Sequence, residues 1–150
     1  RQSEMTAKHR WTTRVRWSEV DPAGIVFYPR FFEWFDLATE SLFESRGQPW
    51  PIIFPLYDIV GVPIAESGAK FSAPVRYGDE VSIDSVVARV EEKTFRVEHE
   101  VKVSDIVCAG GFEQPAGVGR PAQPGDRLRA RAIPEEVVKM LKNGVEDPHG

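Results

Sequence analysis

The first pattern along the chain is an alternation of apolar and polar side chains between Arg10 and Trp17. Side chains on a β-strand point to opposite faces in turn, so this alternation predicts a strand with one buried face. The residues expected on the buried face are Trp11, Thr13, Val15 and Trp17. Turn residues follow between Ser18 and Gly24, which predicts that the strand ends before them.

A helical period replaces the alternation between Pro29 and Arg46. At about 100° per residue, one broad arc of this segment is apolar and the opposite arc is polar. The apolar arc holds Phe31, Phe32, Phe35, Ala38, Thr39, Leu42 and Phe43. Asp36 lies at the edge of the polar arc, which Trp34 and Leu37 interrupt. Proline suits the first turn of a helix and glycine suits the position after the last, so both helix ends are predicted as well.

Strand patterns dominate the second half of the chain. Runs rich in β-branched residues and bounded by turn signals predict strands over Lys70–Tyr77, Glu80–Val90, Phe95–Val103 and Asp105–Phe112. Proline and glycine predict loops over Gly47–Pro55 and Gly110–Asp126, and Pro134–Lys142 is predicted to be a short closing helix. One buried helix followed by an antiparallel sheet predicts a single α+β domain over residues 1–150.

Composition and charge narrow the classes of function. The chain has 150 residues, of which 41% are hydrophobic and 28% charged, and its formal net charge is −4. This acidic, globular composition argues against a protein that binds nucleic acid or an anionic membrane. The longest uncharged run, Gly47–Tyr57, contains three prolines and is too short to cross a bilayer as a helix. The one cysteine cannot form an internal disulfide, which favours a reducing, cytoplasmic location.

Several common catalytic and metal-binding motifs are absent from the sequence. It contains no G-x-S-x-G, no phosphate-binding P-loop and no H-E-x-x-H. The three histidines, His9, His99 and His149, do not recur at the spacing of metal ligands, so no protein-held metal is expected. His99 falls on the apolar face of its predicted strand and Cys108 at an apolar strand end, and both are interpreted as core residues.

One acidic turn stands directly before the aromatic helix. Asp21 places a carboxylate close to the helix start, where the first N–H groups lack partners and carry partial positive charge. Such N–H groups can hold the oxyanion formed during acyl transfer, while a nearby carboxylate can attack the carbonyl or activate water. The alternative interpretation is that Asp21 only binds N–H groups of its own turn.

The residues from Asp21 to Pro29 read D-P-A-G-I-V-F-Y-P, and this run resembles the active-site signature of the 4-hydroxybenzoyl-CoA thioesterase family of hotdog-fold enzymes. The similarity covers nearly the whole chain and continues through Trp34–Asp36, Ile59–Ile64, Lys93–Phe95 and Arg127–Ala130. It implies a hotdog fold, in which a curved antiparallel sheet of about five or six strands wraps one long central helix. It also implies active sites where two subunits meet.

The resemblance implies catalytic roles at the matching positions. Asp21 would be the catalytic carboxylate, the backbone N–H of Tyr28 would polarise the thioester carbonyl, and Gly24 would let the backbone pass close to the acyl group. Asp36 matches a residue that contacts the ring hydroxyl in the hydroxybenzoyl-specific enzymes. The alternative for Asp36 is that it simply belongs to the acidic stripe of the helix.

Other positions bear on the substrate. The residues expected at the acyl group are Pro29, Phe31 and Phe35, and those expected at coenzyme A are Lys93 and Thr94. The aromatic helix face favours an apolar or aryl acyl group. Arg30 and Phe31 stand where the signature more often has Asn or His and then Tyr, which blurs the substrate assignment. Glu91 and Glu92 replace arginines that lie near the coenzyme phosphates in the hydroxybenzoyl enzyme, so either the coenzyme is held differently or the thiol carrier differs.

The predicted function is hydrolysis of an acyl-CoA thioester, preferably an aryl one of the 4-hydroxybenzoyl or benzoyl type, by Asp21 as nucleophile or general base. The alternatives are a thioesterase for short-chain acyl-CoA or carrier-protein thioesters, and a hotdog protein that binds acyl thioesters without cleaving them. No cofactor is expected besides the coenzyme A of the substrate, and no nucleic-acid or membrane partner. Trp34 and Leu37 would be exposed in a monomer, which together with the resemblance predicts a homodimer at least, and further a homotetramer built from two dimers.

Overall fold

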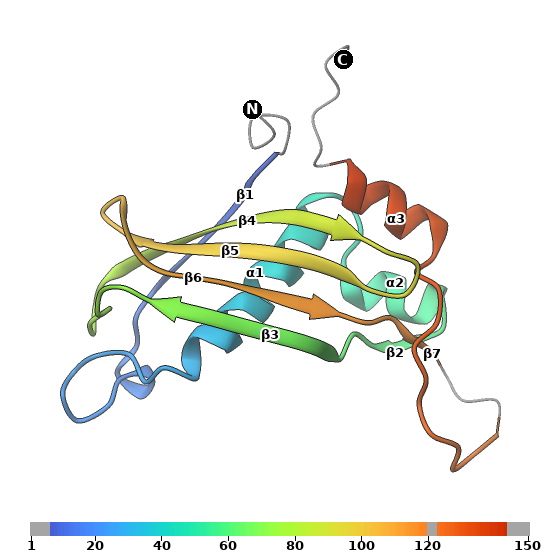
Figure 1. Ribbon diagram of the computed structural model, residues 1–150, viewed down its shortest axis with the longest axis horizontal. Helices are drawn as coiled ribbons and strands as arrows, with labels where there is room; N and C mark the ends of the chain where they lie inside the picture. The colour runs from blue at the N-terminus through green and yellow to red at the C-terminus, as the bar shows by residue number, and fades with distance from the viewer. Residues whose placement is uncertain (1–6, 120–122, 144–150) are drawn as a thin grey trace.

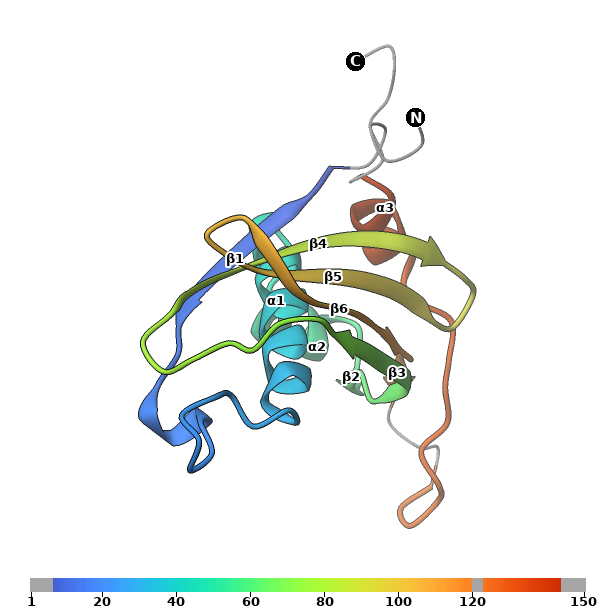
Figure 2. The same cartoon turned by 60° about the vertical axis from the view of Figure 1, so that its left-hand side comes forward.

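One long helix, α1 (Arg30–Ser45), lies against the concave face of a curved five-stranded sheet in the computed structural model (Figure 1). The structure describes residues 7–119 and 123–143. Every neighbouring pair in the sheet is antiparallel, in the order β1-β4-β5-β6-β3. The strands are β1 (His9–Arg14), β3 (Ile64–Phe71), β4 (Glu80–Val90), β5 (Phe95–Val103) and β6 (Ile106–Pro115). Figure 2 shows the sheet curving around α1, which confirms the predicted α+β arrangement.

Two short helices and a small second sheet lie beside the end of the main sheet at which β4 finishes (Figure 1). The helices are α2 (Trp50–Leu56) and α3 (Glu135–Lys142), and the small sheet pairs β2 (Ile59–Gly61) with β7 (Val118–Gly119). Apolar side chains of both helices pack with Leu42 and Phe43 in one core cluster. The C-terminal half of α1 is therefore covered by helices, whereas its start is covered by the loop that follows β1.

The aromatic face of α1 forms the middle of the core, as its period predicts. The buried residues of the helix are Phe31, Trp34, Phe35, Ala38, Thr39, Leu42 and Phe43. The expectation that Trp34 is exposed is wrong, because its side chain is 1% exposed and its indole Nε1 donates a hydrogen bond of 2.9 Å to Glu19 Oε2. Leu37 is 43% exposed, as expected. The argument for subunit association from this helix therefore depends on Leu37.

The first strand is shorter than its alternation predicts. β1 ends at Arg14, and although Val15 is buried, Trp17 begins a 3₁₀ turn and is 72% exposed. The turn forms because the backbone N–H of Arg16 donates to the carboxylate of Glu19 at 2.8 Å. That contact bends the chain before Trp17 can reach the buried face of the sheet.

Two other predicted segments differ from the structure. The predicted strand Lys70–Tyr77 is β3, which instead covers Ile64–Phe71 and ends where two successive N–H groups, of Ser72 and Ala73, donate to the carbonyl of Cys108. The predicted loop Gly47–Pro55 becomes α2 from Trp50 onward, since Pro51 occupies the first turn, where a missing N–H costs no helical hydrogen bond.

The predicted strand Asp105–Phe112 is confirmed as β6, which runs from Ile106 and continues to Pro115. The predicted loop Gly110–Asp126 is therefore wrong over its first residues, and it is wrong again at β7. A Cβ on Gly111 would lie 2.5 Å from the carbonyl oxygen of Gly68 and 2.7 Å from the ring of Phe35. Glycine is required there because α1 packs closely on the sheet. Residues 120–122 of this segment lie outside the described residues, as do Gly144 and His149, whereas the predicted closing helix is confirmed as α3.

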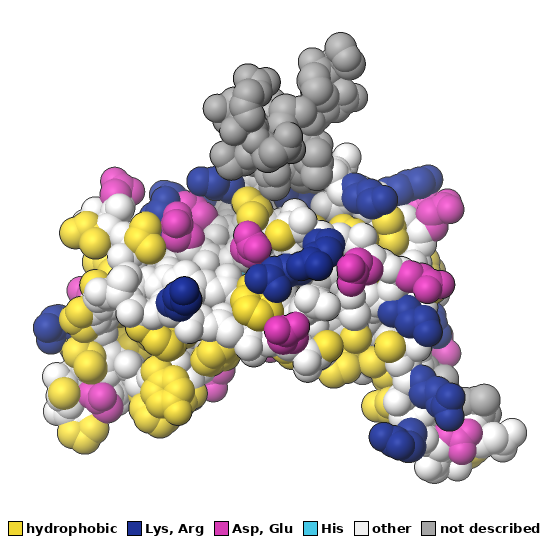
Figure 3. Space-filling view, in the orientation of Figure 1, with side chains coloured by type: hydrophobic (Ala, Val, Ile, Leu, Met, Phe, Trp, Pro, Cys, Tyr) yellow, Lys and Arg dark blue, Asp and Glu magenta, His cyan; other side chains and the backbone are white. Residues whose placement is uncertain are grey.

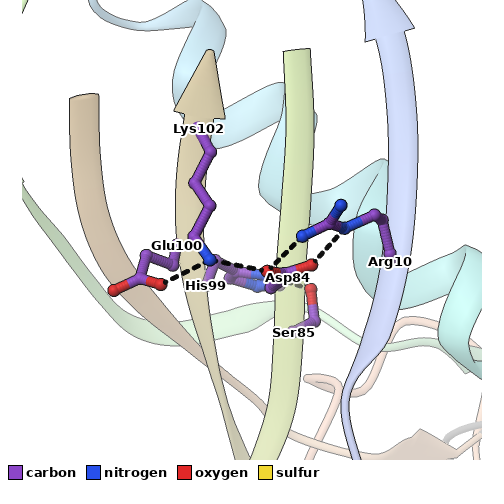
Figure 4. Close-up of polar contacts among 6 residues, drawn as sticks. All are labelled: Arg10, Asp84, Ser85, His99, Glu100 and Lys102. Atoms are coloured by element: carbon purple, nitrogen blue, oxygen red, sulfur yellow. Dashed lines mark hydrogen bonds and ion pairs between the residues drawn. The ribbon is translucent and has the colours of Figure 1, made fainter. Parts of the chain in front are cut away.

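A carboxylate is buried on the outer face of the sheet between two cations. Asp84 on β4 receives hydrogen bonds from Arg10 Nε at 2.7 Å and from Arg10 Nη2 at 2.9 Å, and a third from Lys102 Nζ at 3.1 Å (Figure 4). The hydrogen bond from Arg10, with further help from Lys102, lowers the pKa of Asp84 to about 2 against the effect of burial. The ionised group therefore joins β1, β4 and β5.

Asp84→Asn is expected to lower the free energy of unfolding at pH 7 by about 1–3 kcal/mol, because a charged, hydrogen-bonded group is replaced by a neutral one. A depressed pKa gives stability that is present above the unfolded pKa of 3.8 and is lost as the pH falls through about 2. Urea unfolding at pH 7 and at about pH 2.5 should therefore show the difference from wild type shrinking in acid. The matched control is Glu100→Gln, whose exposed carboxylate also contacts Lys102. An equal deficit at both pH values would contradict the expectation.

Candidate active site

Glu19 makes three of the hydrogen bonds that hold the loop between β1 and α1. Its backbone carbonyl accepts the N–H of Phe27 at 2.9 Å, and its carboxylate accepts the Arg16 N–H at 2.8 Å and the Trp34 indole at 2.9 Å. The loop is further joined to the chain before β4, because Tyr77 donates its N–H to the carbonyl of Gly24 at 3.1 Å. The conformation of the loop is therefore set by the helix and the sheet together.

Asp21 lies partly buried within this loop. Its Oδ1 accepts the backbone N–H of Ala23 at 2.9 Å and, more weakly, that of Ile25 at 3.4 Å. The turn interaction considered from the sequence is therefore present, but it uses one carboxylate oxygen. Within residues 7–119 and 123–143, Oδ2 has no hydrogen-bond partner. Asp21 is thus held in place by its turn while one oxygen stays free to act.

Gly24 leaves open space beside that carboxylate. Its φ of +80° lies in the left-handed region, which side chains with a Cβ rarely adopt, and a Cβ built there would meet nothing within 4 Å. Its N–H donates to the carbonyl of Asp21 at 2.9 Å, which closes the turn. Glycine is therefore needed for the backbone conformation, and the space on its open side is available to a ligand.

The N–H of Tyr28 is an unpaired donor at the start of α1. The next N–H groups are occupied, since Arg30 donates to Phe27 O at 2.9 Å and Phe31 to Tyr28 O at 3.1 Å. Pro29 has no N–H, and Phe32 donates to its carbonyl at 3.1 Å. Among the described residues the Tyr28 N–H has no acceptor. It is the same donor that the resemblance implies for the thioester carbonyl.

Aromatic side chains surround this loop and remain exposed. They are Trp17, Phe27, Tyr28, Phe71 and Tyr77. Trp17 contacts Tyr77 edge to face at a centroid distance of 5.3 Å, and Tyr28 contacts Phe71 at 6.4 Å. Figure 3 shows hydrophobic side chains gathered over the end of the molecule that carries the loop. An exposed apolar surface of this kind is typical of a site for a ligand or a second subunit.

The structure places two of the three residues expected at the acyl group behind the surface. Phe35 is fully buried and stacks on His99 at 4.7 Å, and Phe31 is buried against Trp34 and Phe71, at 5.1 and 5.0 Å. Pro29 caps the start of α1 and is partly buried. Phe31 and Phe35 therefore support the loop and α1 from within the core.

Asp36 lies further along α1, and its carboxyl group contacts a residue that the sequence did not single out. Although Asp36 as a residue is exposed, its carboxyl is hydrogen-bonded to Glu113 of β6. Partial burial of that carboxyl, then the hydrogen bond and negative charge of Glu113, raise the pKa of Asp36 to about 7. Glu113 was missed because it lies in a segment predicted to be loop; a lone acidic residue among glycine, alanine and phenylalanine was the available signal.

Lys93 and Thr94 are not brought to Asp21 within one chain. They lie in the turn between β4 and β5, at the opposite end of the sheet from the loop (Figure 1). The Thr94 hydroxyl donates to Glu91 at 3.1 Å, and Lys93 is exposed beside Glu92. One copy therefore gathers Asp21, Gly24 and the Tyr28 N–H, but it leaves the expected coenzyme residues apart from them.

The described part of the chain offers neither a metal site nor a membrane-spanning helix. Over residues 7–119 and 123–143, no group of three or more His, Cys, Asp and Glu side chains is arranged to hold a metal ion. No helix in that part of the chain has the length and apolar character needed to cross a membrane. His99 and Cys108 are both buried, as predicted.

Solved structures with this fold define its class. A 4-hydroxybenzoyl-CoA thioesterase variant bound to 4-hydroxybenzoyl-CoA superposes with a TM-score of 0.80 at 26% identity, covering 89% of this chain and 98% of that one. A gentisyl-coenzyme A thioesterase superposes with a TM-score of 0.76 at 29% identity, covering 87% and 99%. The fold is therefore the hotdog fold of thioesterases, as the resemblance implies.

Sequence comparison identifies the family within that class. The profile of the thioesterase-like superfamily matches residues 15–141, and the chain belongs to this family. The 4-hydroxybenzoyl-CoA thioesterase of Pseudomonas sp. strain CBS-3 is 29% identical over 133 residues, covering 85% of this chain and 92% of that protein. A 1,4-dihydroxy-2-naphthoyl-CoA hydrolase of Synechococcus sp. strain CC9605 is 29% identical over 132 residues, covering 85% of both. The chain is accordingly an enzyme of the thioester hydrolase class.

Proposed function

We propose that the enzyme hydrolyses aryl-CoA thioesters, with Asp21 as the catalytic carboxylate and the Tyr28 N–H as the donor to the thioester carbonyl. The observation that carries this proposal is the pairing of two free groups on one fixed loop. Asp21 keeps Oδ2 without a partner, and Tyr28 keeps its N–H without an acceptor, among the residues that the structure describes. Groups held in place before substrate arrives lose little freedom in the transition state.

Either of two routes uses these groups in the same positions. In the first, Oδ2 of Asp21 attacks the carbonyl carbon, coenzyme A leaves as its thiolate, and water then hydrolyses the mixed anhydride to free acid and Asp21. In the second, Asp21 removes a proton from the water that attacks the carbonyl. Both routes place negative charge on the carbonyl oxygen, and the Tyr28 N–H stabilises that charge.

An aryl acyl group fits the surroundings of the loop. The open side of Gly24 faces no protein atom within 4 Å of a built Cβ, and Phe27, Tyr28 and Phe71 expose aromatic rings nearby. Aromatic rings contact one another favourably edge to face, so these side chains suit a planar acyl group. The relatives named for hydroxybenzoyl and dihydroxynaphthoyl thioesters support the same substrate class.

The site is completed by a second copy in this proposal. The exposed aromatic residues and Leu37 leave apolar surface around the loop, and Lys93 and Thr94 lie at the opposite end of the sheet. A homodimer, with two dimers forming a tetramer, covers that surface and brings the β4–β5 turn of another copy to the coenzyme. Glu91 and Glu92 repel a phosphate there, so Lys93 alone supplies positive charge within the turn.

A panel of acyl-CoA substrates tests the proposal by release of free thiol. We expect kcat/KM for 4-hydroxybenzoyl-CoA, benzoyl-CoA and 1,4-dihydroxy-2-naphthoyl-CoA to exceed that for acetyl-CoA and hexanoyl-CoA by about tenfold or more, because aromatic contacts contribute about 1 kcal/mol each. Faster turnover of the alkyl substrates would contradict the aryl assignment. Binding of all substrates without thiol release would contradict catalysis itself.

A further inference from the structure

The β4–β5 turn alone leaves the phosphates of coenzyme A short of positive charge. Coenzyme A carries a 3′-phosphate and a diphosphate, whereas the turn offers Lys93 and places Glu91 and Glu92 beside it. Because like charges repel, that turn is poorly suited to hold this anion unaided. Arginine side chains and exposed aromatic rings occur together at another place on the surface, next to the loop that carries Asp21.

An open groove of about 530 Å³ lies at the end of β1. Its lining residues are Thr13, Arg14, Val15, Arg16, Trp17 and Tyr77, and we call it the β1 groove. The chain that leads into β4 lies beside it (Figure 2), since Val15 donates its N–H to the carbonyl of Asp79 at 3.0 Å and accepts that of Gly78 at 3.1 Å. Small-molecule sites usually have volumes of about 300–1,000 Å³, so the β1 groove is large enough for one.

Two arginine side chains of the β1 groove project from the same face of the chain. Arg14 and Arg16 are two residues apart, both are exposed, and the Val15 side chain between them is buried on the other face. The Arg14 guanidinium extends over Gly78, with Nη2 3.8 Å from the position that a Cβ would take there. Over residues 7–119 and 123–143, neither guanidinium makes an ion pair with a carboxylate.

The carboxylates near the β1 groove have other contacts or stay apart from it. Both oxygens of Glu19 accept hydrogen bonds, one from the loop and one from α1. Asp79 accepts a backbone N–H of its own turn at 2.8 Å. Glu80 is opposite Arg14 in the β1–β4 pair, but no ion pair joins the two within the described protein. The N–H donors of both guanidinium groups are therefore available to a ligand.

The aromatic part of the β1 groove consists of Trp17 and Tyr77. Their side chains are 72% and 54% exposed and meet edge to face at a centroid distance of 5.3 Å. An exposed aromatic ring is a surface on which a nucleic-acid base stacks, and arginine beside it binds phosphate through its planar fork of donors. The residues of this groove therefore combine the groups that recognise a nucleotide.

We propose that the β1 groove binds the nucleotide part of coenzyme A. Arg14 and Arg16 hold its phosphates through charge-assisted hydrogen bonds, and Trp17 and Tyr77 stack with its adenine ring. The proposal rests on the proposed function, because the thioester at the other end of the coenzyme must reach Asp21. The groove adjoins the Asp21 loop through the hydrogen bond of 3.1 Å from the Tyr77 N–H to the Gly24 carbonyl, and the flexible phosphopantetheine arm leads from one to the other.

The unpaired arginines favour a nucleotide over a second copy of the chain in the β1 groove. Covering two guanidinium groups with protein costs free energy unless carboxylates meet them, whereas the phosphates of coenzyme A supply the opposite charge themselves. Arg14 and Arg16 thereby provide the positive charge that the β4–β5 turn lacks. The exposed rings on the other side of the loop, such as Phe27 and Phe71, remain for the subunit contact.

The double variant Arg14→Gln/Arg16→Gln tests the proposal on two substrates that share one acyl group. The first is 4-hydroxybenzoyl-CoA, and the second is the 4-hydroxybenzoyl thioester of N-acetylcysteamine, which has no nucleotide. We expect KM for the coenzyme A substrate to rise by about 10-fold to 100-fold with kcat within about twofold of wild type, because remote binding is lost equally in the ground and transition states. For the truncated substrate, kcat/KM should stay within about twofold of wild type.

The matched control is Lys139→Gln/Lys142→Gln. It removes the same charge from two exposed residues of α3, which lies away from the β1 groove (Figure 1). Its kinetic constants for both substrates should equal those of wild type. A general effect of net charge on the anionic substrate would instead appear in both double variants.

Calorimetric binding tests the β1 groove without turnover. Wild type should bind coenzyme A about tenfold more tightly than 3′-dephospho-coenzyme A, and the double arginine variant should lose this difference. Trp17→Ala should weaken binding of adenosine 3′,5′-bisphosphate by about tenfold, because it removes a stacking surface while both arginines stay. Binding of inorganic phosphate should be the same in Trp17→Ala and wild type.

Three results would overturn the proposal. The first is an equal loss of kcat/KM on both substrates in the double arginine variant, which would assign the arginines to the fold or to the reaction itself. The second is an unchanged KM for the coenzyme A substrate there and a raised one in Lys93→Gln, which would place the phosphates at the β4–β5 turn. The third is a smaller assembly of the double variant in light scattering, which would make the groove a subunit interface.

Failure of the proposed function would give a different result. Wild type would then release no thiol from either substrate, whereas calorimetry would still show coenzyme A bound through Arg14 and Arg16.

Discussion

Asp21→Asn is expected to lower kcat for thiol release by about 100-fold to 10,000-fold while leaving the fold intact. The amide retains an oxygen for the N–H groups of Ala23 and Ile25, which Asp21 Oδ1 accepts at 2.9 and 3.4 Å. It cannot attack a carbonyl or take a proton from water at neutral pH. Turnover of 4-hydroxybenzoyl-CoA under saturating substrate measures this loss as a change in kcat, with KM little altered.

The matched control is Asp79→Asn. Asp79 Oδ2 accepts the backbone N–H of Arg76 at 2.8 Å in another turn, so it has the structural role of Asp21 without the catalytic role proposed for Asp21. We expect this variant to keep wild-type kcat. Comparable kcat values for Asp21→Asn and wild type, with a lower melting temperature for the variant, would assign Asp21 to its turn alone.

Loss of the Tyr28 N–H should be nearly as severe. Tyr28→Pro deletes this donor, and kcat/KM is expected to fall by about 100-fold to 1,000-fold, the usual effect of removing one oxyanion donor. No hydrogen bond of the described protein is lost with it, because the N–H has no acceptor there. Thermal unfolding and circular dichroism check that α1 still starts normally.

Tyr28→Ala separates the backbone group from the side chain. It removes the exposed ring that contacts Phe71 but keeps the N–H, so kcat/KM should fall by less than about tenfold. Equal losses in Tyr28→Pro and Tyr28→Ala would place the effect in the ring. The N–H would then have no part in stabilising the oxyanion.

The sequence predicts best those elements in which buried and exposed side chains alternate with a simple period. β4 and β5 have the predicted bounds Glu80–Val90 and Phe95–Val103, because one face of each is buried and the other is wet. α1 differs from the predicted helix by one residue at each end. The turn at Asp21 was also recognisable, since the chemistry of its residues is local to the turn.

The missed features depend on contacts between distant segments. Trp34 is hidden by a loop whose position is set by Glu19, and no helical period contains that information. The glycines of β6 were interpreted as part of a loop. Gly111 instead lacks a side chain because the ring of Phe35 packs against its backbone. The contact between Asp36 and Glu113 joins a helix to a strand that was itself predicted only in part, so this side of the site could not be assembled from the sequence.

The missing side chain at Gly111 sets the spacing between the two layers of the protein. Any Cβ there would overlap the ring of Phe35, which is the neighbour of Asp36 in α1. A larger residue would have to push the helix away from β6, because the ring of Phe35 and the carbonyl of Gly68 leave no room for a side chain. The distance between the helix and the sheet is thus decided by a glycine whose side is closed by the Phe35 ring.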